Sequence, residues 1–206
     1  MEQDRVRELL DETCRTPPLT LERNGAVIRA QLEDLHCRIN VNNLADPEDE
    51  ETEQALVRLI EQLQGDQEAL SIDPERLVSS LRERLGGSGP DDGDGAGRDG
   101  GGGRLLASVS ELLRLPGVDP EGYRALEPHI TALPESGTAI NAQLAPPEIR
   151  RALNLPAPED LDPDAFGPGR YARLAISVDT DQRIHRQCAI IDAITGEVVL
   201  RRLRGC

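Results

Sequence analysis

Two short stretches of the chain share one design and limit its architecture more than any other feature. Residues 39–48 read INVNNLADPE and residues 140–148 read INAQLAPPE, with one extra asparagine in the first copy. In each, an extended Ile-Asn segment leads into a turn that contains Asn or Gln, and a proline then occupies the first position of a helix. Asp46 is the candidate N-cap of the first helix. Because both copies predict a strand-to-helix corner, we expect a helical region bracketed by extended chain.

Both ends of the chain alternate apolar and polar residues, as half-buried strands do. From residue 28 to 32 every second residue is apolar, and from 35 to 41 the apolar positions move by one. This shift predicts a bulge or tight turn near Glu33 and Asp34. At the other end, three antiparallel strands in a meander are predicted over residues 172–178, 184–190 and 197–205. A small sheet needs a partner surface, so the early and late strands are expected to form one sheet.

The middle of the chain has a helical period instead. Two apolar stripes predict two helices, with Leu56, Leu59, Ile60 and Leu63 in the first and Leu77, Val78, Leu81 and Leu85 in the second. Capping signals at Ser108 and Asp119 predict two shorter helices. Residues 86–104, rich in Gly and Asp, are too poor in apolar groups to pack and are predicted to form a flexible loop.

The expected fold class is therefore α+β, with two domains. Residues 1–44 and 157–206 are expected to form a discontinuous domain, in which an antiparallel sheet packs on a short N-terminal helix. Residues 45–156 are expected to form a large inserted domain that is mainly α-helical and carries the loop at 86–104.

The charge of the chain disfavours several classes of partner. Its 206 residues carry a formal net charge of −15, and every basic residue is an arginine. Binding to phosphate backbones or anionic membranes requires cationic patches. With two Tyr, one Phe and no Trp, the chain also lacks stacking platforms for single-stranded nucleic acid. We expect no nucleic-acid partner, and no apolar run approaches the roughly 20 residues that cross a membrane.

The titratable residues form no catalytic constellation. His36, His129 and His185 stand alone in the sequence, and no nucleophile, metalloprotease or phosphate-loop motif is present. No catalytic or cofactor-binding residue is predicted, and the protein is expected not to be an enzyme.

A glycine-rich acidic run offers one candidate metal site. Asp91, Asp92 and Asp94 present hard oxygen ligands on a flexible backbone, which suits Ca²⁺. The run lacks the downstream Glu of an EF-hand, and its composition favours the alternative of an acidic linker without metal.

The cysteines have no metal-ligand spacing, and two of them suggest a disulfide. Cys37 and Cys188 both lie on the apolar sides of predicted strands, so they could pair in an oxidising compartment if those strands are neighbours. The alternative is two buried free thiols.

Residues 112–126, LLRLPGVDPEGYRAL, resemble a helix-hairpin-helix motif. A helix-hairpin-helix or SAM-like scaffold or nucleic-acid-binding module is therefore the alternative function. Acidic residues surround the hairpin, so the motif is expected to serve helix packing instead.

Taken together, the segments from residue 26 to residue 204 resemble the minor pseudopilin K family of bacterial type II secretion systems. The most specific parts are LEDLHCRINVNNLAD at 32–46, the stretch from Leu106 to Asn141, and APPEIRRAL at 145–153. The sequence departs from the family pattern at residues 142–144, and a Gly/Asp run replaces the acidic, Tyr-containing segment that usually precedes LASV.

This resemblance implies a pseudopilin-like fold and a non-enzymatic role at the tip of the secretion pseudopilus. There the protein would assemble with two other minor pseudopilins, I and J, to initiate or cap the filament during protein secretion. Family members can hold Ca²⁺ in the helical domain, and an N-terminal helix holds them at the periplasmic face of the inner membrane. That helix is missing at this start, so Val6 to Cys14 are expected to be its tail, and the chain as given is expected to be soluble.

Overall fold

The computed structural model describes residues 10, 12–66, 71–86, 104–162, 169–180 and 183–202. The chain forms two compact units. The sheet unit contains residues 1–37, 140–145 and 157–206, and the helical unit contains residues 38–139 and 146–156. Relative to the predicted domains, residues 38–44 fall in the helical unit and residues 140–145 in the sheet unit. Most of the predicted N-terminal helix and of the loop at 86–104 lies outside the described residues.

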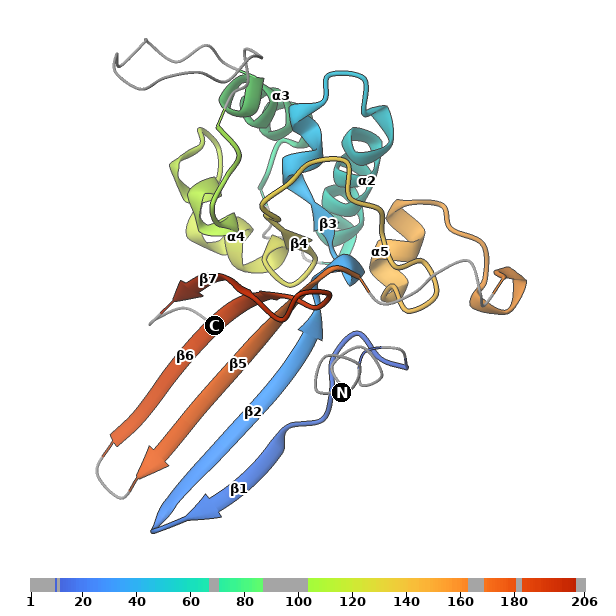
Figure 1. Ribbon diagram of the computed structural model, residues 1–206. Helices are drawn as coiled ribbons and strands as arrows, with labels where there is room; N and C mark the ends of the chain where they lie inside the picture. The colour runs from blue at the N-terminus through green and yellow to red at the C-terminus, as the bar shows by residue number, and fades with distance from the viewer. Residues whose placement is uncertain are drawn as a thin grey trace, which may run out of the picture. The chain divides into compact units, whose positions relative to one another are not determined.

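One five-stranded antiparallel sheet dominates the sheet unit (Figure 1). Its spatial order is β1-β2-β5-β6-β7, and the strands are β1 (Leu19–Arg23), β2 (Ala26–Asp34), β5 (Tyr171–Thr180), β6 (Arg183–Asp192) and β7 (Val198–Arg202). The predicted meander of three late strands is confirmed, and so is the pairing of early with late strands through β2 and β5. Strand β1 was not predicted. It joins β2 through Asn24 and Gly25, whose φ angles of 50° and 76° give the two-residue turn that suits a hairpin.

The predicted turn after the first long strand is present as a 3-10 helix. Strand β2 ends at Asp34, and η1 (Leu35–Cys37) follows directly. The Asp34 side chain is completely buried, and its two carboxylate oxygens accept hydrogen bonds from three donors. These are the backbone N–H of His36 at 2.8 Å, Asn141 Nδ2 at 3.1 Å and the backbone N–H of Gly169 at 3.2 Å. One carboxylate therefore holds the end of β2 and two segments that are distant in sequence.

The disulfide predicted between Cys37 and Cys188 is wrong. Cys37 bonds to Cys14 instead, with the two Cα atoms 5.9 Å apart. The physical reason is the turn η1, which takes Cys37 out of the strand, whereas Cys188 lies in β6 opposite Ala175. Cys188 is disulfide-bonded as well, so the alternative of two free thiols is also excluded.

The core of the helical unit is built on the two predicted stripes. Helix α2 (Glu50–Asp66) buries Leu56, Leu59, Ile60 and Leu63, and helix α3 (Pro74–Gly86) buries Leu77, Val78, Leu81 and Leu85, which confirms both patterns. The remaining elements are η2 (Val41–Ala45), η3 (Val109–Arg114), α4 (Pro120–Leu126), α5 (Pro147–Ala152) and the parallel pair β3 (Ile39–Asn40) and β4 (Ile130–Thr131). In the sheet unit, η4 (Pro158–Asp160) is a further short turn of helix.

The two corners differ in where their helices begin. At the second corner α5 starts at Pro147, as predicted. At the first corner α2 starts at Glu50 rather than at Pro47, so Asp46 as its N-cap is wrong. Asp46 instead accepts a hydrogen bond from the Glu48 N–H at 2.9 Å and closes a turn. The Asp49 carboxylate accepts a hydrogen bond from the backbone N–H of Thr52 at 2.9 Å and so satisfies a donor in the first turn of α2.

The asparagines of the first corner join three segments of the helical unit. Asn40, Asn42 and Asn43 are 3%, 0% and 8% exposed, so their amide groups need partners inside the protein. Asn42 Nδ2 donates to the Leu106 carbonyl at 2.9 Å and to the Leu133 carbonyl at 2.7 Å, and its Oδ1 accepts from the Leu106 N–H at 2.9 Å. Asn40 and Asn43 bond to residues 133–138 in the same way. Asn40, Asn42 and Asn43, which we call the asparagine cluster, therefore join these segments in addition to the short pairing of β3 with β4.

Candidate interaction surface

Across β1, β2 and β5, one face of the sheet is apolar and the other, which we call the polar face, is mainly polar. Cross-strand partners point to the same side of a sheet, so the register assigns each residue to a face. The apolar face consists of Leu19, Leu21, Ile28, Ala30, Leu32, Leu174, Ile176 and Val178. These eight side chains form one continuous patch, and each of them is half-buried or exposed. Exposed apolar patches of this kind mark sites where a partner binds.

The most exposed part of this face is the edge strand β1. Leu19, the first residue of the strand, is 73% exposed, and Leu21, its middle residue, is 55% exposed. Within the described part of the chain β1 pairs only with β2, so its outer edge has no strand partner (Figure 1). Such an edge accepts a strand or a peptide from another chain through backbone hydrogen bonds. Full burial of each leucine would add roughly 1.5–3 kcal/mol to that contact.

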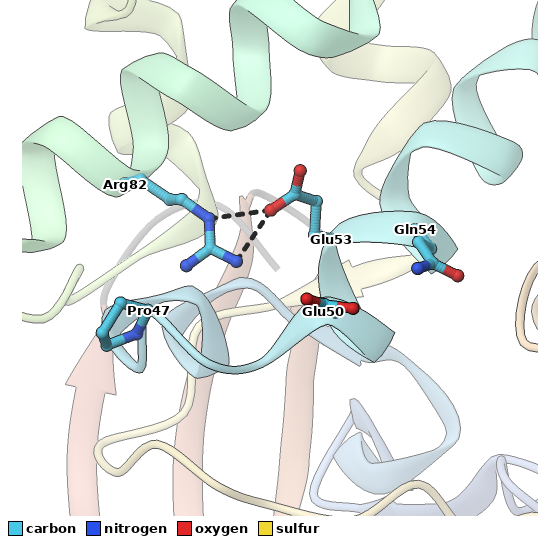
Figure 2. A pocket seen from close by; sticks show the side chains of 5 residues that line it. All are labelled: Pro47, Glu50, Glu53, Gln54 and Arg82. Atoms are coloured by element: carbon cyan, nitrogen blue, oxygen red, sulfur yellow. Dashed lines mark hydrogen bonds and ion pairs between the residues drawn. The ribbon is translucent and has the colours of Figure 1, made fainter.

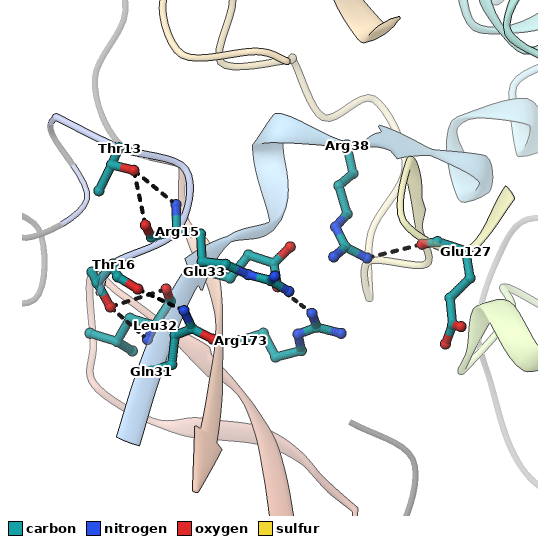
Figure 3. Close-up of polar contacts among 9 residues, drawn as sticks. All are labelled: Thr13, Arg15, Thr16, Gln31, Leu32, Glu33, Arg38, Glu127 and Arg173. Atoms are coloured by element: carbon teal, nitrogen blue, oxygen red, sulfur yellow. Dashed lines mark hydrogen bonds and ion pairs between the residues drawn. The ribbon is translucent and has the colours of Figure 1, made fainter. Parts of the chain in front are cut away.

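The segment that precedes β1 is held along β2 by polar contacts (Figure 3). The backbone N–H of Thr16 donates to the Leu32 carbonyl at 2.9 Å, and Gln31 Nε2 donates to the Thr16 carbonyl at 2.8 Å. Next to them Glu33, only 8% exposed, pairs with Arg15 at 3.4 Å and with Arg173. The position of β1 is therefore fixed by its own hairpin and by this preceding segment.

In the helical unit, a surface pocket of about 320 Å³ lies beside the start of α2 (Figure 2). Arg82 of α3 crosses it and pairs with Glu53 at 2.7 Å. The same guanidinium donates to the carbonyls of Asp46 and Asp49, each at 3.0 Å. All three donor nitrogens of Arg82 are thus engaged within the unit, which makes Arg82 a clamp between α3 and the turn before α2.

Of the predicted site residues, Asp91, Asp92 and Asp94 lie outside the described residues, so Ca²⁺ binding stays a prediction. Among the described residues no group of three or more His, Cys, Asp or Glu side chains is placed to hold a metal ion.

The three histidines have separate surroundings. In the sheet unit, the ring of His36 stacks on Tyr171 with 6.1 Å between centroids, and His185 is exposed on β6. In the helical unit, burial lowers the pKa of His129 below its ordinary value of 6.5, Glu148 opposes this shift and Arg38 adds to it. Arg38 itself donates to the Glu127 carbonyl at 3.0 Å (Figure 3).

The segment with helix-hairpin-helix appearance is a packing element of the helical unit. Its first helix, η3, is a 3-10 helix rather than an α-helix. Gly117 in the hairpin has a φ of 85° and lies against the Arg76 side chain of α3. Asp119 caps α4 by accepting from the Gly122 N–H at 2.7 Å.

Comparison with known proteins identifies the helical unit. A family described as type II secretion system protein K matches residues 37–135, which include the asparagine cluster and helices α2 to α4. Residues 37–135 therefore match the type II secretion system protein K family. The fold of the whole chain is similar to a chain in the crystal structure of the GspK-GspI-GspJ complex from the enterotoxigenic Escherichia coli type 2 secretion system. That match has a TM-score of 0.69 and 17% identity, and covers 99% of this chain and 92% of the other.

No curated protein sequence matches the chain. In the described part of the chain, no helix is both long enough and apolar enough to span a membrane.

Two features of the sheet were missed by reasoning from the sequence. The edge strand β1 had a signal, since Asn24-Gly25 is a strong hairpin turn pair. The arginines on the polar face of the sheet had none, because only the pairing of β2 with β5 and of β5 with β6 brings them together.

Proposed function

We propose that the protein is a non-enzymatic minor pseudopilin at the tip of the type II secretion pseudopilus. It would assemble there with the counterparts of GspI and GspJ and help to initiate or cap the filament during protein secretion. The observation that carries this proposal is the fold similarity over 99% of the chain to a member of the GspK-GspI-GspJ complex, together with the protein K family match.

The sheet unit supports the proposal with a surface suited to a partner. The exposed leucines of β1 and the free edge of that strand offer both apolar area and backbone hydrogen bonds. Among the described residues, the contacts of Asp34, Arg82 and Glu33 hold the fold together.

The capping role has a steric reason. The helical unit contains more than half of the residues of the chain. A subunit with so large an additional unit would leave little room for a further subunit above it in the filament. Membership of a secretion pseudopilus would place the protein on the periplasmic side of the inner membrane, an oxidising setting in which the disulfide between Cys14 and Cys37 is stable.

Co-purification with the GspI and GspJ counterparts tests the proposal. We expect a complex at both low and moderate salt. The double substitution Leu19→Asp and Leu21→Asp is expected to weaken it at least tenfold, because each aspartate would have to be desolvated at the contact. Leu113→Asp is the matched control, since Leu113 is 43% exposed in the helical unit. Failure to form any complex under either salt condition would contradict the proposed function, and an unaffected complex with the double variant would remove β1 from the interface.

A further inference from the structure

The polar face of the sheet carries one continuous groove. A surface pocket of about 290 Å³ is lined by Arg29, Gln31, Ser177 and Arg186, among others, and a second of about 190 Å³ by Arg15, Glu33 and Arg173. Gln31 and Ala175 line both pockets and are cross-strand partners in the pairing of β2 with β5. The two pockets therefore adjoin, and we call them together the arginine groove.

The groove is basic in a strongly acidic chain. Four guanidinium groups line it, and among its lining residues the sole carboxylate is that of Glu33, which Arg15 and Arg173 neutralise (Figure 3). The chain as a whole carries a net charge of −15. Arginines that gather on one face against such a background mark a surface with its own local potential.

Two of the four arginines are available for a ligand. Arg29 and Arg186 are both exposed, and they flank Ser177 from the neighbouring strands β2 and β6. Arg29 makes one long contact of 3.7 Å with Asp179, whose side chain is 38% exposed. No ion pair of Arg186 is found within the described part of the chain. The small residue between them, Ser177, and its same-face neighbour along β5, Ala175, leave the floor of the groove open.

The spacing and the charge select the kind of ligand. Strands β2 and β6 lie on either side of β5, so the backbones of Arg29 and Arg186 are about 10 Å apart. Alternate residues of an extended peptide are about 7 Å apart. The long side chains of Arg and Glu can bridge the difference between this spacing and the spacing of the two arginine backbones. Long polyanions and anionic membranes meet the repulsion of the whole acidic surface, whereas a short acidic segment feels mainly charges within the roughly 8 Å Debye length.

We propose that the arginine groove binds an acidic segment of a partner polypeptide, with its carboxylates paired to Arg29 and Arg186. Arginine suits this role because its planar guanidinium forms two parallel hydrogen bonds to one carboxylate. This inference goes beyond the proposed tip assembly and does not depend on it, because the isolated chain carries the whole groove.

The test is a fluorescence anisotropy titration of the full chain with a labelled peptide of four Glu-Ser repeats. We expect binding that weakens with salt, and none with the matched peptide of Gln-Ser repeats. The double substitution Arg29→Gln and Arg186→Gln should lower the affinity about tenfold. Arg151→Gln is the matched control, because the Arg151 side chain is 61% exposed in the helical unit. Both arginines of the double variant are exposed, so it should keep the far-UV circular dichroism of the parent chain.

Four results would overturn the proposal. The first is no binding of the Glu-Ser peptide at low salt, and the second is an equal loss in the Arg151→Gln control. The third is tighter binding of hexametaphosphate or of vesicles with anionic lipid that the double variant loses, which would make the groove a phosphate site. The fourth is concentration-dependent self-association in sedimentation velocity that the double variant loses, which would make a second copy of this chain the occupant.

Discussion

Replacing Asn42 by alanine is expected to destabilise the helical unit more than any substitution on its surface. The Asn42 side chain is completely buried and makes three hydrogen bonds, two to Leu106 and one to Leu133. Alanine removes all three and leaves two carbonyls and one N–H without their partners. Both leucines are themselves buried, at 2% and 1% exposure, so water does not readily replace the lost amide.

The size of the effect follows from the cost of these unpaired groups. Each buried polar group left without a partner costs about 1–3 kcal/mol, so three groups cost roughly 3–6 kcal/mol after partial relaxation. A typical domain is stable by only about 5–15 kcal/mol, so this loss approaches half of the total.

Urea unfolding followed by circular dichroism at 222 nm measures the change. With a slope of about 2 kcal/mol per molar urea, the midpoint for helix loss should fall by roughly 1.5–3 M. Gln54→Ala is the matched control, because it removes an amide from an exposed position of α2 and should change the midpoint little. A shift below about 0.5 M for Asn42→Ala would refute the view that the asparagine cluster joins the segments of this unit.

Two further predictions concern the disulfide and the acid response. Cys14 and Cys37 are 23 residues apart, and a bond that closes such a loop stabilises by about 3 kcal/mol, so the double substitution Cys14→Ser and Cys37→Ser should lower the thermal midpoint clearly; an unchanged midpoint would contradict this. The pKa of His129 is lowered by burial, so the unfolded chain binds this proton more tightly than the folded chain does. The free energy of unfolding that depends on a neutral His129 is fully present above pH 6.5. It is lost as the pH falls through the lower pKa of the folded state. Chemical unfolding at pH 7.5 and 5.5 should show this loss, and His129→Gln should reduce it; an identical pH dependence in the variant would argue against it.

Much of the fold could be predicted because the signals are local. The stripes of α2 and α3 and the alternation of β2 and β5 depend only on spacing within one element, and all four elements are present. The turn after β2 was also expected, although its 3-10 form was not.

The rest depends on contacts that spacing within an element does not encode. Cys37 has the spacing of a strand residue, but the turn η1 brings it to Cys14 instead of β6. Asp46 had the residue type of a cap, but the turn it closes delays the start of α2 to Glu50. The arginine groove requires Arg29 and Arg186 to stand on either side of Ser177, which follows only from the register of three strands.

The central strand pair of the sheet also determines when the fold can be completed. Asp34 of β2 is opposite Ala172 of β5, and Val27 is opposite Asp179. The whole of the helical unit lies between these partners along the chain. Bringing such distant residues together costs loop-closure entropy, which is lower once the intervening chain is compact. We therefore expect the helices, whose contacts are nearer in sequence, to form first, and β2 to pair with β5 only after they have formed.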